Sequence, residues 1–289
     1  LISLGYGSPT AFTGYNLSTA WDLSTISWQG PTSGKYKALT EVGNAFKFVF
    51  GNSGTRIYVC DSTGDSIHEY HLSTAYDIST ASHDHELDVS SQTTFPCGVD
   101  FKSDGTKMFV ADNVADEILE YDLSTAWDIS TASYSTNYDI NNSSDGLPSY
   151  LAEGYLVAFK FKPDGTAFFI AGLSEDRYMM KFTLSTAWDI TTASYNSYLY
   201  VRGLSNFEKV TDFAFNPAGT RMILTTGYDE LIMETALSTP WSITSASFVR
   251  GFTTDGYMYY MNGGQFNGDG TKFIALNTSV DYLLEFNLE

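Results

Sequence analysis

Basic residues are scarce in this chain. Only 15 Lys and Arg stand against 34 Asp and Glu, which gives a formal net charge of −19 over 289 residues. Non-specific affinity for nucleic acid depends on Lys and Arg that neutralise phosphates, so nucleic acid is excluded as a partner. Long apolar runs are also absent. No segment reaches the roughly 18 consecutive apolar residues of a membrane-spanning helix, so membrane insertion is excluded.

Charged residues of both signs are few, at 17%, whereas hydrophobic residues make up 43% and aromatic residues 16%. A disordered chain has the opposite balance, so the composition predicts a packed globular protein. Cysteine is nearly absent too. Cys60 and Cys97 are the only two, which excludes a disulfide scaffold but leaves open whether they form one bridge or remain buried thiols.

The sequence begins at Leu1, and we expect it to be a processed or excised segment, so its location cannot be read from a signal peptide. The acidic, Ser/Thr-rich composition favours an extracellular location or one on a cell or virion surface. Three glycosylation sequons point the same way. They begin at Asn16, Asn142 and Asn277.

One repeat runs through the sequence. LSTAWDLSTIS begins at Leu17 and returns with small changes at Leu72, Leu123, Leu184 and Leu237, and another copy begins at Leu288. The copies are 55, 51, 61, 53 and 51 residues apart. A repeat of this length is typical of solenoids, propellers and other arrays.

A second motif alternates with the first. FVFGNSGTRIYV, VDFKSDGTKMFV, FKFKPDGTAFFI, FAFNPAGTRMIL and GQFNGDGTKFIA each place a Gly-Thr turn between two apolar runs. Such a turn between β-prone runs predicts a hairpin, because Gly tolerates the positive φ of a tight turn. A third strand such as DEILEYDL and a fourth such as ASYSTNYDI follow, so each unit has four antiparallel strands.

Repeated four-stranded units predict an all-β fold, a β-propeller. Five hairpins predict five blades, and six blades with incomplete terminal blades are the alternative. The F-x-x-D-G-T hairpins resemble the repeats of YVTN-type and lactonase-like propellers from about Gly43 onward. The LSTAWDIST turn is similar to repeats in microbial and phage surface and fibre proteins. A shared scaffold does not carry an activity with it.

The predicted ring covers residues 21–289 as one domain, closed by pairing between an N-terminal strand at residues 25–29 and the last blade. Closure of this kind removes open sheet edges. Residues 1–20 are then left as extra strands that can be donated to a neighbouring molecule. Self-association is therefore expected. The assembly candidates are Leu1, Ile2, Leu4, Tyr6, Phe12, Tyr15 and Leu17.

An aromatic residue recurs in the LSTAWD turn. We interpret it as packing between blades, with Asp, Ser and Thr bonding nearby backbone amides. The loops of the opposite face vary more and are rich in tyrosine, so they are the predicted contact face for a glycan or a protein. The ligand-binding candidates are Tyr150, Tyr155, Tyr257, Tyr259 and Tyr260.

All four histidines fall in one hairpin. His83 and His85, two residues apart, are expected on one face of their strand, and aspartates recur just before each third strand. The candidate metal ligands are His83, His85, Asp65 and Asp116, with a transition metal or calcium as the ion. Solvated strands and Asp turns are the alternative interpretation. No other cofactor is expected.

Strand A of each unit carries polar residues that are expected near the channel: Lys47, Asp100, Lys160, Asp212 and Gln265. We expect the two lysines to neutralise the two carboxylates rather than to leave one with a raised pKa. No catalytic motif appears. The sequence therefore predicts a non-catalytic surface protein that acts in fibre assembly or adhesion. A multivalent lectin and a five-bladed glycoside hydrolase are the alternatives.

Overall fold

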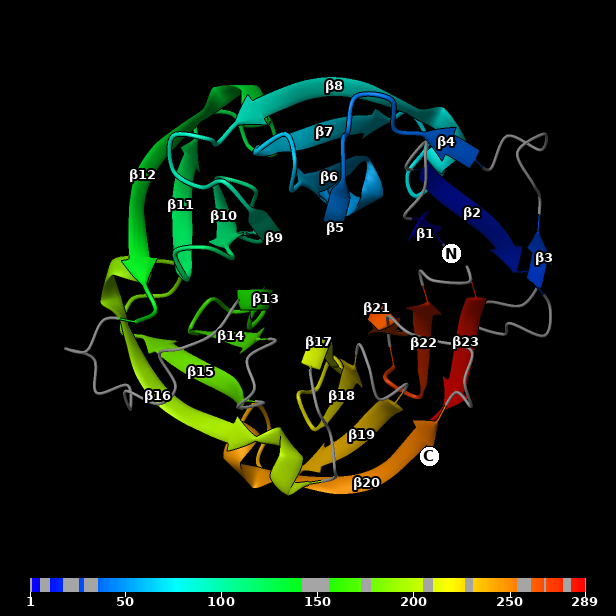
Figure 1. Ribbon diagram of the computed structural model, residues 1–289, viewed down its shortest axis with the longest axis vertical. Helices are drawn as coiled ribbons and strands as arrows, with labels where there is room; N and C mark the ends of the chain where they lie inside the picture. The colour runs from blue at the N-terminus through cyan, green and yellow to red at the C-terminus, as the bar shows by residue number, and fades with distance from the viewer. Residues whose placement is uncertain are drawn as a thin grey trace.

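The strands form a ring of antiparallel sheets, shown in a computed structural model (Figure 1). The structure describes residues 2–5, 11–17, 26–28, 36–141, 156–172, 178–204, 210–226, 231–253, 261–267, 269–277 and 282–288. These residues contain strands and short 3-10 helices but no α-helix. No helix among them is long and apolar enough to cross a membrane.

Four regular blades each contain four strands that pair in chain order. Their strands are β5 (Ala45–Gly51), β6 (Arg56–Asp61), β7 (Ser66–Leu72), β8 (Ala81–Asp88), β9 (Pro96–Phe101), β10 (Lys107–Asp112), β11 (Glu117–Leu123), β12 (Ala132–Asp139), β13 (Leu156–Phe161), β14 (Ala167–Gly172), β15 (Tyr178–Leu184), β16 (Ala193–Tyr200), β17 (Val210–Phe215), β18 (Arg221–Thr226), β19 (Leu231–Leu237) and β20 (Ala246–Thr253). The first strand of each blade lies nearest the centre of the ring and the fourth lies at its rim (Figure 1).

Two further sheets are built differently. The last contains only three strands: β21 (Met261–Phe266), β22 (Lys272–Asn277) and β23 (Tyr282–Asn287). The N-terminal sheet contains β1 (Ile2–Gly5), β2 (Ala11–Leu17), β3 (Ile26–Trp28) and β4 (Tyr36–Ala38). Its strands do not pair in chain order, because β4 pairs with β2.

The all-β propeller is confirmed, but the prediction of five blades is wrong, and the six-blade alternative is not matched either. The structure has four blades of four antiparallel strands. The count failed because it completed the last sheet with the strand around Ser27, whereas that strand pairs with β2 through Asn16. The described residues contain no pairing between β3 and β23. The domain division at residue 20 stays a prediction.

The aromatic residue of each LSTAWD turn lies in the left-handed region of the backbone. Trp127 has φ 67° and its amide donates to the carbonyl of Gly105 at 2.9 Å. Its indole packs beside Phe101, with ring centroids 5.3 Å apart. In the preceding blade the Tyr58 hydroxyl donates to the Trp127 carbonyl at 2.6 Å. The predicted packing between blades is confirmed here.

The same contact recurs around the ring. Trp188 lies 4.8 Å from Phe161 of its own blade and 6.3 Å from Phe109 of the preceding one, measured between ring centroids. Trp241 contacts Phe215 and Phe169 in the same way, at 5.0 and 6.3 Å. Each of these indoles therefore joins two neighbouring blades.

A short 3-10 helix follows each of these turns: η4 (Ile78–Thr80), η5 (Ile129–Thr131), η8 (Ile190–Thr192) and η10 (Ile243–Ser245). In η5 the carboxylate of Asp128 accepts the amide of Ser130 at 3.0 Å. The first residue of the helix, Ile129, is fully buried. The predicted Asp-to-backbone bonds are confirmed, and they leave these Asp side chains occupied in the turns.

We predict that Gly105→Ala lowers the free energy of unfolding by about 2–5 kcal/mol, because alanine is strained at positive φ and its methyl group would crowd the indole. Gly105 has φ 75°, and a Cβ atom there would lie 2.4 Å from Trp127. Urea denaturation measures the change. Gly203→Ala is the control, since Gly203 does not have positive φ and its Cβ would meet its nearest neighbour at 3.3 Å. Equal losses in both variants would contradict the prediction.

Candidate functional site

Four charged side chains come from the innermost strands of the regular blades. Lys47 lies on β5, Asp100 on β9, Lys160 on β13 and Asp212 on β17, and these strands surround the centre of the ring (Figure 1). Counted back from the turn glycine of each repeat, Lys47 and Asp212 stand two residues earlier than Asp100 and Lys160. The sequence analysis named these residues as polar residues near the channel without assigning them a catalytic role. In the structure they lie at two different heights along the innermost strands.

Asp212 is the centre of this group. One carboxylate oxygen lies 3.1 Å from Lys47 Nζ and the other lies 3.7 Å from Lys160 Nζ. Lys47 Nζ also donates to the carbonyl of Thr211 at 3.3 Å. The Asp212 side chain is 9% exposed, whereas that of Lys160 is 40% exposed. Lys160 is therefore the cation of the group that solvent or a ligand reaches most easily.

The two carboxyl groups differ in their pKa values. Burial alone would raise the pKa of Asp212, but the charges of Lys160 and Lys47 outweigh it, so the pKa lies below its usual value. Burial raises the pKa of Asp100, because the two backbone amides and Lys160 near its carboxylate compensate only in part. Those amides belong to Phe101 and Phe161, at 2.8 and 2.9 Å.

The expectation that the lysines neutralise both carboxylates is therefore wrong for Asp100. A pair of carboxyl groups with separated pKa values is the usual arrangement for acid–base chemistry. A carboxyl group with a raised pKa, such as Asp100, suits proton transfer, and Lys160 suits the stabilisation of a developing negative charge. Gln265 on β21 belongs to the same series and is exposed.

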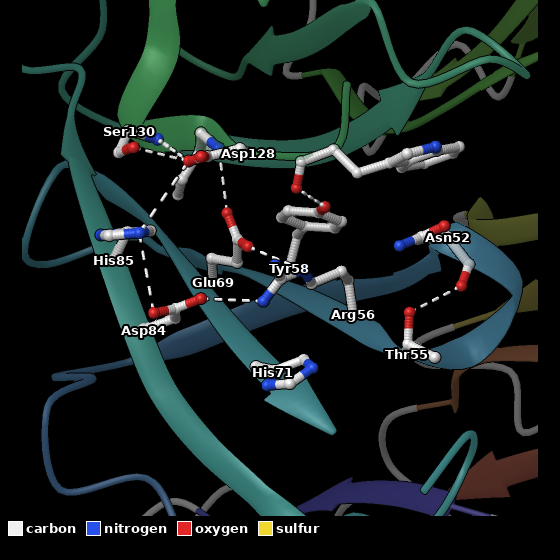
Figure 2. A network of polar contacts seen from close by, with 12 residues as sticks. Asn52, Thr55, Arg56, Tyr58, Glu69, His71, Asp84, His85, Asp128 and Ser130 are labelled. Carbon is white, nitrogen blue, oxygen red and sulfur yellow. Dashed lines mark hydrogen bonds and ion pairs between the residues drawn. The ribbon is translucent and has the colours of Figure 1, made fainter. Parts of the chain in front are cut away.

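A second polar network joins the first two regular blades (Figure 2). The fully buried carboxylate of Glu69 on β7 accepts the amide of Ile129 in the next blade at 2.9 Å, and it lies 3.1 Å from Arg56 Nε. Arg56 also pairs with Asp84 at 2.8 Å. This network connects one blade to the turn of the next, so we assign it to the scaffold.

His85 belongs to this network. Its Nε2 atom lies 3.6 Å from Asp84 and 3.9 Å from Asp128 of the next blade (Figure 2). His83 instead faces His68, with His83 Nε2 and His68 Nδ1 separated by 3.1 Å. A β-bulge between β7 and β8, at Glu69 and Tyr70, separates the two histidines. His83 is opposite Tyr70 and His85 is opposite Glu69, which are consecutive residues of β7. The expectation that the two histidines lie on one face is therefore wrong, because the bulge interrupts the alternation along β8.

Asp65 and Asp116 do not join the histidines. Both have positive φ, 48° and 55°, and their carbonyls accept the amides of Val89 and Ile140. The Asp116 carboxylate accepts the side chain of Asn141 at 3.2 Å. No group of three His, Cys, Asp or Glu residues that could hold a metal ion occurs in the described part of the chain. The calcium ion considered from the sequence stays a prediction.

The tyrosines predicted to bind a ligand lie outside the described residues: Tyr150, Tyr155, Tyr257, Tyr259 and Tyr260. The sequon at Asn142 lies outside them as well, whereas Asn16 is on β2 and Asn277 ends β22. Glycosylation stays a prediction. Cys60 and Cys97 are both buried, and neither forms a disulfide.

Of the assembly candidates, Leu1 and Tyr6 lie outside the described residues. Within the chain, Leu4 pairs with Phe12 between β1 and β2. Phe12 is fully buried and packs against Phe48 and Tyr70, with ring centroids 5.3 and 6.1 Å apart. The remaining candidates, Ile2, Tyr15 and Leu17, pair with Gly14, Trp28 and Ile26. Self-association through these strands stays a prediction.

No protein-family model matches this chain, and no curated protein matches it. Solved structures do. The periplasmic gluconolactonase of Pseudomonas aeruginosa superposes with a TM-score of 0.63 at 13% identity, over 100% of this chain and 78% of the other. A putative 6-phosphogluconolactonase from Bacteroides uniformis has a TM-score of 0.58 at 14% identity, and the match covers 86% of this chain and 68% of the other. A functionally unknown protein from Desulfotomaculum acetoxidans has a TM-score of 0.62 at 10% identity, and the match covers 98% of this chain and 91% of the other.

At these identities the likeness shows a β-propeller fold with lactonase-like neighbours. It contradicts our expectation of a non-catalytic fibre, adhesion or lectin protein, because neighbours over most of the chain are named as lactonases. The expectation that the chain is not an enzyme is contradicted by the same finding. The five blades of the glycoside hydrolase alternative are contradicted by the four blades of the structure. These expectations rested on the absence of a linear motif, whereas the central group is assembled from four blades.

We predict that the Asp212 carboxylate stabilises the fold above about pH 4 and that this contribution is lost as the pH falls further. The unfolded chain takes up a proton near pH 3.9, whereas native Asp212 stays ionised to lower pH. In Asp212→Asn, the free energy of unfolding should therefore fall less steeply as the pH is lowered, by up to about 1.4 kcal/mol per pH unit. Urea denaturation between pH 5 and pH 2.5 measures this.

Asp139→Asn serves as the matched control, because Asp139 is an exposed aspartate at the end of β12. The change of slope in Asp212→Asn is measured against this control. An unchanged slope in Asp212→Asn would show that the lysines do not hold this carboxylate in its ionised form.

Proposed function

We propose that this chain is a hydrolase that opens a lactone at the centre of the ring. The observation that carries the proposal is the group formed by Lys47, Asp100, Lys160 and Asp212 on four innermost strands, in which one carboxyl group has a raised pKa and the other a lowered pKa. The names of the lactonase-like neighbours support the choice of a cyclic ester as substrate. The F-x-x-D-G-T repeats are then those of the YVTN-type and lactonase-like propellers that they resemble.

The proposed reaction begins with Asp100 as the general base. Its carboxylate takes a proton from a water molecule, and the water oxygen attacks the carbonyl carbon of the ring ester. The carbonyl oxygen becomes an oxyanion, which the ammonium group of Lys160 stabilises. When the carbonyl re-forms, the ring C–O bond breaks and the departing oxygen takes the proton from Asp100. The product is the open hydroxy acid.

Asp212 and Lys47 position the reacting groups. The Asp212 carboxylate lies between the two ammonium groups, at 3.1 and 3.7 Å, so it fixes the position of Lys160. Lys47 is only 18% exposed, and together with the Thr211 carbonyl it anchors this arrangement to β17. An extracellular or surface location is part of the proposal, and one neighbour is described as periplasmic.

The test is acid release from a panel of γ- and δ-lactones, measured by the base needed to hold the pH constant. We predict that Asp100→Asn lowers kcat/KM by about 10²–10⁴, the usual loss when a general base is removed. Lys160→Met should lower it by about 10²–10³, because a single charge that stabilises the oxyanion is lost.

The matched control is Lys162→Met. Lys162 lies two residues along the chain and pairs with Asp164 in the exposed hairpin turn, at 2.6 Å, so this variant should keep the wild-type rate. If the wild type opens no lactone in the panel, or if Asp100→Asn and Lys162→Met have equal rates, the proposal is wrong.

A further inference from the structure

Lys181 reverses the charge of a position that is acidic in the other regular blades. This position is the last residue before the β-bulge of each third strand, and the other three blades hold Glu69, Glu120 and Glu234 there. In the third regular blade the bulge lies between Lys181 and Phe182. The contacts of Lys181 therefore distinguish this blade from the others.

The cation that pairs with this glutamate is missing from the third blade as well. In the other regular blades the second strand begins with a basic residue that forms an ion pair with the glutamate. The pairs are Arg56–Glu69, Lys107–Glu120 and Arg221–Glu234. β14 begins with Ala167 instead. The third blade thus lacks both members of the pair, and its lysine occupies the place of the carboxylate.

The ammonium group of Lys181 reaches the turn of the next blade. Its Nζ atom donates to the carbonyl of Trp241 at 3.1 Å and lies 5.9 Å from the centre of the Phe169 ring. This turn has Ser242 where the turns of the other three blades have an aspartate. No carboxylate of the described residues forms an ion pair with Lys181. Its neighbours at the blade junction are therefore a carbonyl oxygen and an aromatic ring.

These surroundings favour the neutral amine. Burial of the side chain lowers the pKa of Lys181, and the charge of Lys162 lowers it further. Only a neutral amine has the lone pair that attacks a carbonyl carbon, and both desolvation and a neighbouring cation are known to activate lysines in this way. Lys181 is partly exposed, so a small molecule in solvent can reach it.

We propose that Lys181 is a site of covalent acylation, at which Nζ accepts the acyl group of an activated carboxylic ester. The neutral amine attacks the ester carbonyl carbon, a C–N bond forms and the ester C–O bond breaks. The departing oxygen takes up the proton that the nitrogen loses, so the products are an amide on Lys181 and a free alcohol. The site lies on the third strand of its blade, away from the innermost strands (Figure 1), and does not depend on the proposed lactonase activity.

The experiment is labelling of the full chain with N-hydroxysuccinimidyl acetate, an activated ester, followed by mass spectrometry of its peptides to obtain a rate for each lysine. At pH 7.5 Lys181 should be acetylated at least about threefold faster than Lys102 and Lys162, because more of its amine is neutral. These two lysines are matched controls. Both are partly exposed, like Lys181, but they pair with Asp104 and Asp164 at 2.8 and 2.6 Å.

Two variants test the cause of the reactivity. Ala167→Glu places a carboxylate where the other blades have the basic partner, so the cross-strand pair is restored with reversed charges and acetylation of Lys181 should slow at least about threefold. Lys162→Met removes the neighbouring cation and should slow the reaction by a smaller factor, without disturbing the packing around the buried Ala167. The proposal is overturned if Lys181 of the wild type reacts no faster than Lys102 and Lys162, or if neither variant slows its reaction.

Discussion

The regular blades depend on the contact between the aromatic residue of the LSTAWD turn and the glycine of the hairpin turn. Trp127 has a strained backbone conformation with positive φ. Two contacts offset this strain: its amide donates to the carbonyl of Gly105, and its indole fills the space above that glycine. The indole also reaches the preceding blade, where a Cβ on Gly51 would lie 2.6 Å from it. One turn therefore fixes both the shape of its own blade and the angle to the next.

That constraint places the central group. Because each turn locks a blade against its neighbour, the first strands of successive blades are brought to the centre of the ring at fixed positions. Lys47 on β5 and Asp212 on β17 are 165 residues apart in numbering, and their side chains form a 3.1 Å ion pair. No short sequence motif can encode such a site, since each blade contributes one residue.

Much of the fold was predictable from the sequence, because its hairpins and turns are determined by residues that are close together in the chain. The hairpins follow from the Gly-Thr turns, and the turn Asp and Trp contacts follow from their recurrence. The number of blades was not predictable, because it depends on which strand pairs with Ser27, and that partner is chosen by packing over a long separation. The bulge that separates His83 from His85 shifts the register by one residue, and nothing in the sequence of β8 indicates it.

The candidate site was predictable in its membership but not in its electrostatics. Lys47, Asp100, Lys160 and Asp212 could be named from the first strands of the repeats. The side chains lie at two different heights along the innermost strands. This difference decides which carboxylate pairs with the lysines. Asp212 is placed between the ammonium groups, and Asp100 is left with two backbone amides in a half-buried position. This difference separates the carboxyl group whose pKa is lowered from the one whose pKa is raised.

The most direct measurement of this account is an NMR titration of the side-chain carboxyl carbons of Asp100 and Asp212, assigned with Asp100→Asn and Asp212→Asn. The account predicts that Asp100 titrates above the ordinary aspartate value of about 3.9 and Asp212 below it. Replacing Lys47 and Lys160 with Met should raise the pKa of Asp212. Ordinary pKa values for both residues would contradict the assignment of a catalytic base to the centre of the ring.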